Sequence, residues 1–167
     1  MICVDVDYRS DRVVAAAVGF HAWTDDAPAY ERTKVSFEPP ADYEPGSFYR
    51  RELPHLLAVL DDVPEPITAD TTIVIDGYVW LDAGAKGLGA HLHDAHPAHP
   101  TVVGVAKRPW RGGAAGSSVV RGDSKTPLYV TAIGMNLAVA AAAVVSMHGP
   151  FRTPTLLKRV DRLARDA

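Results

Sequence analysis

The chain has 167 residues, of which 47% are hydrophobic and 22% are charged, with a formal net charge of −3 at pH 7. This length and composition predict one folded domain, residues 1–167, with a core of its own. The negative balance excludes the global basic field of many nucleic-acid binders, although it leaves room for a local basic patch. Cys3 is the single cysteine, so no internal disulfide can form and a reducing, cytoplasmic location is expected. No basic leader and no apolar run long enough to span a bilayer is visible, so no membrane partner is expected.

The order of the predicted elements indicates a mixed α/β architecture. The sequence predicts strands at 1–8, 12–23 and 30–37, a helix at 47–60, a strand at 71–75, a helix at 88–95, strands at 101–107, 117–121 and 128–132, and helices at 136–147 and from 153 onward. Three antiparallel strands followed by alternating strands and helices predict a mixed sheet flanked by helices.

Proline and alanine positions predict where the helices begin or bend and which of them is buried. Pro54 lies inside the first helix and predicts a kink or a late start, because proline removes a backbone hydrogen bond. The helix at 136–147 is alanine and valine almost throughout and is expected to be buried. Thr153 and Pro154 predict the start of the last helix, with Thr153 as the N-cap and Pro154 at the first helical position.

Two predicted strands each deliver an aspartate. Asp5 follows three apolar residues in the first strand, and Asp76 ends the strand at 71–75. A carboxylate in such a strand is costly unless it is paired or bound to a metal. Each aspartate alone could simply cap a strand end and face water, but the pair favours a divalent-metal site.

The predicted topology resembles the ribonuclease-H-like fold, in which acids on the first and fourth strands converge on metal ions. Six segments, in order, also resemble motifs of the endonuclease V family. They are Val4–Tyr8, Tyr43–Gly46 with Arg51 and Glu52, Val74–Gly77, Val102–Lys107, Pro127–Val130 and Gly149–Thr155. Together they span essentially the whole chain, although the family's leading helix has no counterpart ahead of Met1.

The resemblance implies a nuclease that cleaves a phosphodiester near inosine in DNA or RNA and needs Mg²⁺ or Mn²⁺. It makes Asp5, Glu52 and Asp76 the metal-binding carboxylates, which suits a hard ion that prefers oxygen ligands. Lys107 would neutralise charge on the phosphate or orient the water. The alternative for Lys107 is a solvated lysine at a strand end. The protein is expected to act as a monomer with nucleic acid as its partner.

The resemblance also assigns substrate contacts. Tyr43 matches the wedge tyrosine that fills the gap left by a flipped base, and a ring suits that role because stacking replaces what flipping loses. A turn residue packing beside Pro45 is the alternative for Tyr43. The implied substrate-binding residues are Tyr43, Pro45, Gly46, Arg51 and Gly77.

Several positions depart from the family pattern. Glu44 stands where the family has an apolar residue, and Tyr78 and Val79 replace its histidine and glycine after the Asp-Gly pair. Asp82 occupies a further histidine position, where it could act as a fourth metal ligand or cap a glycine turn. Met135 replaces the histidine of the Gly-His pair. These departures keep two alternatives open, a divergent nuclease with an altered substrate and a noncatalytic nucleic-acid-binding relative.

Two further patterns are weak. The histidines at 91, 93, 96 and 99 do not share one helix face and Pro97 interrupts them, so a solvated connection is expected rather than a zinc site. The glycine-rich run at 84–89 lacks the spacing of a Walker loop. It is expected to line the substrate cleft, with Lys86 available to a phosphate.

Overall fold

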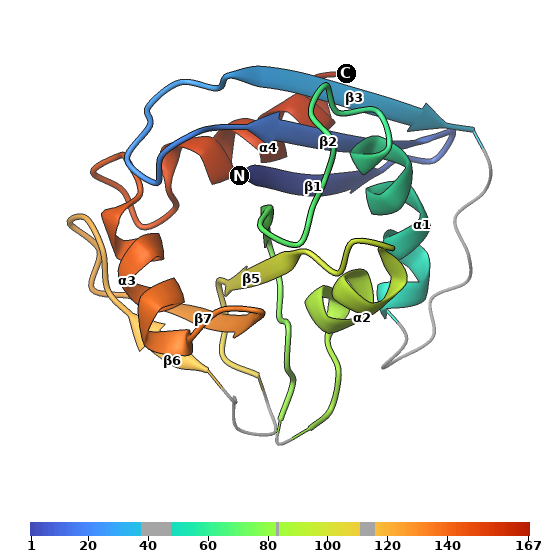
Figure 1. Ribbon diagram of the computed structural model, residues 1–167. Coiled ribbons are helices and arrows are strands. Elements are labelled where there is room, and N and C mark those ends of the chain that lie inside the picture. Colours follow the sequence, from blue (N-terminus) through green and yellow to red (C-terminus); the bar gives the residue numbers. More distant parts are fainter. Residues whose placement is uncertain (38–47, 83, 111–115) are drawn as a thin grey trace.

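A computed structural model of the chain describes residues 1–37, 48–82, 84–110 and 116–167. Within these ranges the chain forms a seven-stranded sheet and four helices (Figure 1). The strands are β1 (Ile2–Tyr8), β2 (Val13–Gly19), β3 (Tyr30–Ser36), β4 (Thr72–Ile75), β5 (Thr101–Ala106), β6 (Ser117–Val119) and β7 (Leu128–Ile133). The helices are α1 (Phe48–Leu60), α2 (Leu88–Ala95), α3 (Leu137–Ser146) and α4 (Thr155–Asp166).

The sheet is mixed, as the sequence predicts. Its strand order is β3-β2-β1-β4-β5-β7-β6. The first three strands pair antiparallel, β1, β4 and β5 run parallel, and β7 and β6 return antiparallel at the other edge. The parallel centre is what brings the ends of β1, β4 and β5 to one edge of the sheet.

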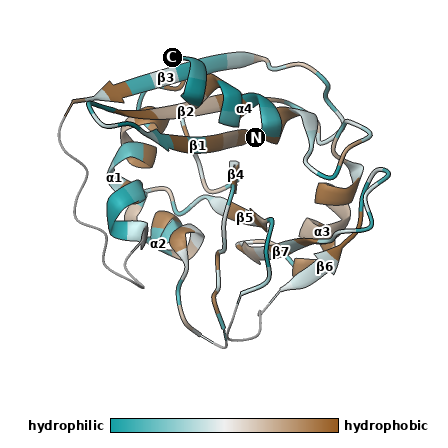
Figure 2. Ribbon diagram, turned by 180° about the vertical axis from the view of Figure 1, so that it is seen from behind, coloured by the Kyte–Doolittle hydropathy of each residue, from teal (hydrophilic) through white to brown (hydrophobic). Residues whose placement is uncertain are grey.

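Helices cover both faces of the sheet, so the apolar strands of its centre are buried from two sides (Figure 1). On one face, Leu56 and Leu60 of α1 and Leu92 of α2 pack against the strands. On the other, α3 and α4 pack, and α4 alternates hydrophilic and hydrophobic positions around its circumference (Figure 2). No helix within the described ranges has the length and apolarity needed to cross a membrane.

Some predicted element boundaries are wrong. β2 ends at Gly19 rather than at residue 23, because the chain turns there and the Asp25 carboxylate accepts hydrogen bonds from the amides of His21 and Ala22 at 2.9 Å each. The helix α1 runs continuously from Phe48 through Pro54, whose side chain is exposed, so the late start is wrong. Residue 47, the predicted N-cap, lies outside the described residues.

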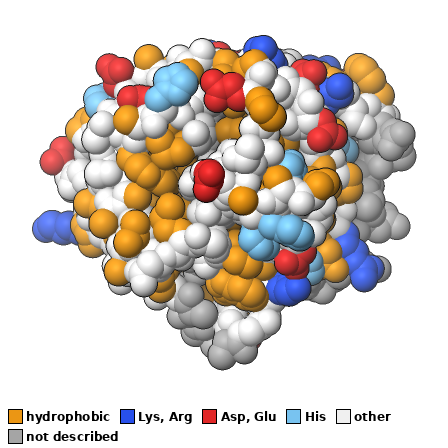
Figure 3. Space-filling model, viewed as in Figure 1, with side chains coloured by type: hydrophobic (Ala, Val, Ile, Leu, Met, Phe, Trp, Pro, Cys, Tyr) orange, Lys and Arg blue, Asp and Glu red, His pale blue; other side chains and the backbone are white. Residues whose placement is uncertain are grey.

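The predictions for the last two helices need correction. Pro154 has ψ 151°, which is extended, so it precedes α4 as its N-cap and the helix begins at Thr155. The helix α3 is not fully buried, since Val139 is 57% and Val145 is 45% exposed. Hydrophobic side chains accordingly gather at the surface where α3 lies (Figure 3). An almost wholly apolar helix has no polar face, so its sequence could not show which side meets solvent.

Candidate active site

An acidic cleft of about 250 Å³ lies where β1 and β4 end, between α1 and α4. All four residues predicted to be catalytic line it: Asp5, Glu52, Asp76 and Lys107. Asp7, Asp161 and Arg165 complete its charged lining, which gives five carboxylates against two cationic groups. A cleft with this charge excess attracts cations and, left bare, repels phosphate.

Strand register places the two aspartates side by side. Val4 of β1 lies opposite Ile75 of the parallel strand β4, so Asp5 and Asp76 follow at the same level. Beyond Asp76, the chain passes closely over β5. A Cβ at Gly104 would lie 2.6 Å from the carbonyl oxygen of Gly77, so this crossing needs the glycine. The chain therefore leaves β4 in a fixed direction immediately after Asp76.

Glu52 is held by the contact between α1 and the end of β1. The Tyr8 hydroxyl donates a hydrogen bond to the backbone carbonyl of Arg51 at 2.9 Å. The guanidinium carbon of Arg51 lies 4.0 Å from the centroid of the Tyr8 ring, a cation–π contact. These contacts fix the first turns of α1, and with them Glu52, beside Asp5. The predicted role of Arg51 in substrate binding stays a prediction, since the observed contacts of its side chain are structural.

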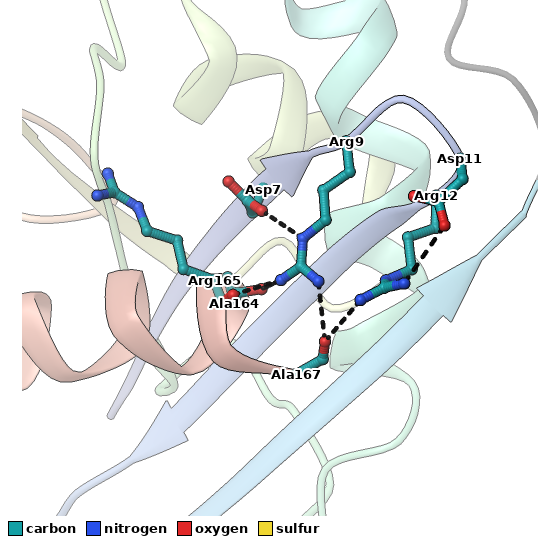
Figure 4. Close-up of polar contacts among 7 residues, drawn as sticks. All are labelled: Asp7, Arg9, Asp11, Arg12, Ala164, Arg165 and Ala167. Atoms are coloured by element: carbon teal, nitrogen blue, oxygen red, sulfur yellow. Dashed lines mark hydrogen bonds and ion pairs between the residues drawn. The ribbon is translucent and has the colours of Figure 1, made fainter.

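The helix α4 supplies Asp161 and Arg165, and Arg9 fastens its end to β1. The Arg9 guanidinium pairs with Asp7 at 3.0 Å and donates to the backbone carbonyls of Ala164 and Ala167 at 3.1 Å each, and to that of Arg165 (Figure 4). A cation at the negative end of a helix dipole is stabilising.

The side chain of Arg165 extends away from Arg9 (Figure 4). It pairs with Asp161 at 2.8 Å. Arg9 thus fixes the backbone at the end of α4, while Arg165 orients the Asp161 carboxylate towards the cleft.

Burial and mutual repulsion perturb the carboxylates. Burial, followed by the charge of Asp76, raises the pKa of Asp5 to about 7. Burial, followed by the charges of Asp5 and Asp76, raises the pKa of Glu52 to about 8. No Lys or Arg within the described parts of the chain forms an ion pair with either carboxylate. The charge of Lys107 acts in the opposite direction on Asp5, and that of Arg51 on Glu52, but neither offsets the effects of burial and of the neighbouring carboxylates.

Lys107 bonds to one carboxylate of the cleft. Its ammonium nitrogen lies 2.5 Å from an Asp76 oxygen. Burial lowers the pKa of Lys107, but the hydrogen bond and charge of Asp76 outweigh it, so the net change is upward and the lysine stays protonated. The backbone carbonyl of Lys107 accepts a hydrogen bond from Arg152, which fixes the end of β5. The Lys107 side chain is 44% exposed as well as paired, so its role in catalysis stays a prediction.

The acidic side chains are the right type of ligand for a divalent cation, but their positions do not form a ready-made coordination site. Within the described ranges, no three Asp, Glu, His or Cys side chains stand close enough together to hold a metal ion as placed. The donor oxygens of Asp5, Glu52, Asp76 and Asp161 are nevertheless the type that Mg²⁺ and Mn²⁺ prefer. The unpaired, mutually repelling carboxylates of Asp5 and Glu52 are the groups that such a charge would relieve.

Asp161 is a candidate that the sequence prediction missed. It lies on the side of α4 next to the buried residues Leu157, Val160 and Ala164, where an acid is half-buried. Its charge acts on both Asp5 and Lys107. An acid bordering the apolar stripe of an amphipathic helix was the available signal.

The other predicted residues lie elsewhere. Gly77 follows Asp76 directly, whereas Tyr43, Glu44, Pro45 and Gly46 lie outside the described residues. Asp82 is exposed and does not line the acidic cleft, which leaves it no place as a fourth ligand there. Lys86 pairs with Asp94 at 2.6 Å at the surface, and its availability to a phosphate stays a prediction. His91 stacks on Tyr49 with ring centroids 3.5 Å apart.

A family model described as Endonuclease V matches residues 1–158. This chain belongs to the endonuclease V family. An endonuclease V of Streptomyces avermitilis is 35% identical over 187 aligned positions, which cover 98% of this chain and 78% of that protein. One of Streptomyces coelicolor is 32% identical, over 98% of this chain and 77% of that protein. Membership of the family makes this protein a nuclease by descent.

Solved structures support the same grouping. The crystal structure of the Streptomyces avermitilis endonuclease V superposes with a TM-score of 0.75 and 28% identity, over 99% of this chain and 79% of that chain. An endonuclease V of Ciona intestinalis, crystallised with a 24mer DNA containing an inosine followed by a ribo-adenosine, gives a TM-score of 0.79 at 18% identity, over 99% and 84% of the two chains. The predicted ribonuclease-H-like fold and the predicted family are thus confirmed.

Proposed function

We propose that this protein is a metal-dependent endonuclease that cleaves a phosphodiester bond near deaminated adenine, that is inosine, in DNA or RNA. The observation that carries the proposal is the acidic cleft, in which Asp5, Glu52, Asp76 and Asp161 meet Lys107 in a member of the endonuclease V family. The Ciona intestinalis relative was crystallised with inosine-containing DNA, which supports the choice of lesion.

The role proposed for the carboxylates is to bind a divalent cation, whose charge would offset their mutual repulsion. Asp5, Glu52 and Asp76 would bind Mg²⁺ or Mn²⁺, with Asp161 as a further oxygen donor on the α4 side. Such an ion supplies Lewis-acid activation of the phosphate and of the attacking water. With the carboxylate charge offset in this way, the cleft would repel a phosphate less.

Lys107 is placed to stabilise charge that develops on the phosphate. It is protonated and already lies within hydrogen-bonding distance of Asp76. If Asp76 served as a metal ligand, the Lys107 ammonium group would be free to donate a hydrogen bond to a non-bridging phosphate oxygen. Removal of such a donor typically costs about a hundredfold in rate.

A second candidate, a nuclease with an altered substrate, is favoured by Met135, Tyr78 and Val79. Met135 packs against the hydrophobic core and cannot exchange a proton. The Tyr78 hydroxyl donates to the carbonyl of Arg108 at 2.7 Å, and the buried Val79 amide donates to the Thr131 hydroxyl at 2.8 Å. Groups that already form hydrogen bonds within the protein are not available to pair with the edge of a flipped base. This candidate therefore predicts a weak preference for inosine over adenine.

A cleavage panel tests the proposal. Strands of DNA and RNA containing inosine, uracil, an abasic site or only normal bases are incubated with Mg²⁺, Mn²⁺ or chelator. The proposal expects metal-dependent cleavage that is fastest on the inosine strand. Asp26→Asn removes an exposed acid in a loop outside the cleft, so it is the control for loss of a negative charge and should cleave at the wild-type rate. Equal rates on all strands would favour the second candidate, and no cleavage under any condition would leave only nucleic-acid binding.

A further inference from the structure

A second groove, called here the basic groove, adjoins the acidic cleft. Its volume is about 460 Å³, and it shares Lys107 and Asp161 with the cleft. The segment before α4 and the first turns of that helix supply Phe151, Arg152 and Lys158. Three cationic groups and one carboxylate thus line the basic groove, the reverse of the balance in the acidic cleft. A polyanion whose phosphate lies in the cleft is therefore held most favourably along this groove.

An exposed aromatic ring stands in the basic groove. Phe151 is 64% exposed, and the ammonium nitrogen of Lys158 lies 5.4 Å from the centroid of its ring. A single exposed apolar side chain is common on protein surfaces and needs no explanation by itself. What distinguishes Phe151 is the way its backbone is fixed.

Arg121 fastens the loop of Phe151 from beneath. This arginine is only 5% exposed, and its guanidinium donates to the backbone carbonyls of Met147, Gly149, Phe151 and Arg152. Burial of a guanidinium is costly, and here its donors are directed at four carbonyls within the six residues 147–152. The arrangement restricts a segment that would otherwise sample many conformations.

Two further contacts hold the same loop. Gly122 has φ 58°, and a Cβ there would lie 2.0 Å from the carbonyl oxygen of Pro150, so any larger residue would clash with the backbone of this loop. Arg152 donates to the carbonyl of Pro127 at 2.7 Å and to that of Lys107. The exposed ring is therefore carried by a preorganised loop that is tied to the strand end bearing Lys107.

We propose that Phe151 is a stacking platform for one nucleobase of the bound strand, and that Lys158 contacts the phosphate next to that base. The proposal rests on the proposed nuclease function, because it places the platform beside the phosphodiester to be cut. A rigid ring loses little conformational freedom when a base stacks on it. Every nucleobase has a π-face, so the platform tolerates any base and serves DNA and RNA alike.

The test is a binding cycle between the ring and single bases. Short inosine-containing single strands of DNA and RNA carry an abasic site at each position in turn. Their Kd values are measured by fluorescence anisotropy at low salt with Ca²⁺, which shares the preference of Mg²⁺ for oxygen ligands and offsets the charge of the acidic cleft. The proteins are the wild type, Phe151→Leu, Phe151→Tyr and Phe37→Leu. Phe37 is 75% exposed and does not line the basic groove, so it is the matched control for loss of an exposed ring.

The expected result is one abasic position that weakens wild-type binding by about 5- to 150-fold, the range for one stacked base. Phe151→Leu should lose the same factor on the intact strand and become insensitive to that position. Phe151→Tyr should restore both effects, while Phe37→Leu should behave as the wild type. Thermal melts check that each variant is folded.

Three results would overturn the proposal: a wild type that ignores every abasic position, a Phe151→Leu variant that keeps its sensitivity, or no strand binding by the wild type. Cleavage of the intact strand with Mg²⁺ or Mn²⁺ is measured separately. Cleavage without an effect of Phe151 would remove the platform and leave the nuclease function. The binding cycle without cleavage would keep the platform and remove the nuclease function.

Discussion

Replacement of Asp5 by asparagine should stabilise the metal-free protein at alkaline pH. The pKa of Asp5 rises from an ordinary 3.8 to about 7 because the carboxyl is buried and lies near Asp76. Folding therefore favours the protonated form, so the contribution of Asp5 to stability is complete below pH 3.8 and is lost as the pH rises through 7. The side-chain oxygen that accepts from the Val6 amide at 2.9 Å is retained in asparagine.

The magnitude follows from the change in proton affinity. A rise of about three pH units corresponds to roughly 4 kcal/mol of destabilisation at pH 8, at about 1.4 kcal/mol per unit. Relaxation and water entry in the open cleft reduce this, and we expect a gain of about 2 kcal/mol for Asp5→Asn. For a chain of this length that is an increase of about 4 to 8 °C in Tm.

The assay is thermal unfolding in chelator at pH 4 and pH 8, with Asp26→Asn as the control. The variant and the wild type should melt together at pH 4 and separate at pH 8. Addition of Mg²⁺ at pH 8 should then raise the Tm of the wild type more than that of the variant, because a ligand that binds only the folded state stabilises it. A variant less stable than the wild type at pH 8 would refute the reasoning and make Asp5 a structural residue.

Three further predictions concern α4 and the pH dependence. Asp161→Asn should lower the rate of metal-dependent cleavage at least tenfold with little change in Tm. Arg162→Gln, which changes the exposed neighbouring residue, should keep the wild-type rate. Equal rates for the two variants would remove Asp161 from the site. Because Glu52 has a pKa of about 8 and must be deprotonated to bind a metal, the Mg²⁺ affinity measured by titration should rise by up to about tenfold per pH unit between pH 7 and 8. Below pH 7 the rise should be steeper, because Asp5, with a pKa of about 7, must also lose its proton; a flat profile would contradict this. Arg9→Met should lower Tm by about 2 to 6 °C, because the charge-assisted hydrogen bonds from Arg9 to α4 are lost. The Arg12 guanidinium makes only a longer contact with the carbonyl of Ala167, at 3.4 Å, so Arg12→Met should lower Tm less.

The parts of the site that lie on strand ends could be predicted from the sequence. Asp5 and Asp76 each belong to an apolar run, and parallel neighbours bring their ends together whatever the loops do. Lys107 follows the next parallel strand for the same reason. The register of these strands is fixed by buried side chains on both faces, which the sequence displays directly.

The contribution of α4 could not be predicted, because it depends on how a helix rotates against the sheet. Asp161 borders the buried stripe of α4, and only packing decides that this side faces the acidic cleft. The role of Arg121 was hidden for a similar reason. Its four carbonyl partners come from a segment that is 26 to 31 residues away in the sequence.

The most direct test of the account is single-turnover cleavage of an inosine-containing strand by the wild type and by Asp76→Asn, with Mg²⁺, Mn²⁺ or chelator. The account predicts cleavage only with metal, and a loss of at least a hundredfold in Asp76→Asn, while Asp26→Asn keeps the wild-type rate. Cleavage by the wild type in chelator, or an Asp76→Asn variant that cuts at the wild-type rate, would contradict the claim that the acidic cleft is a metal-dependent nuclease site.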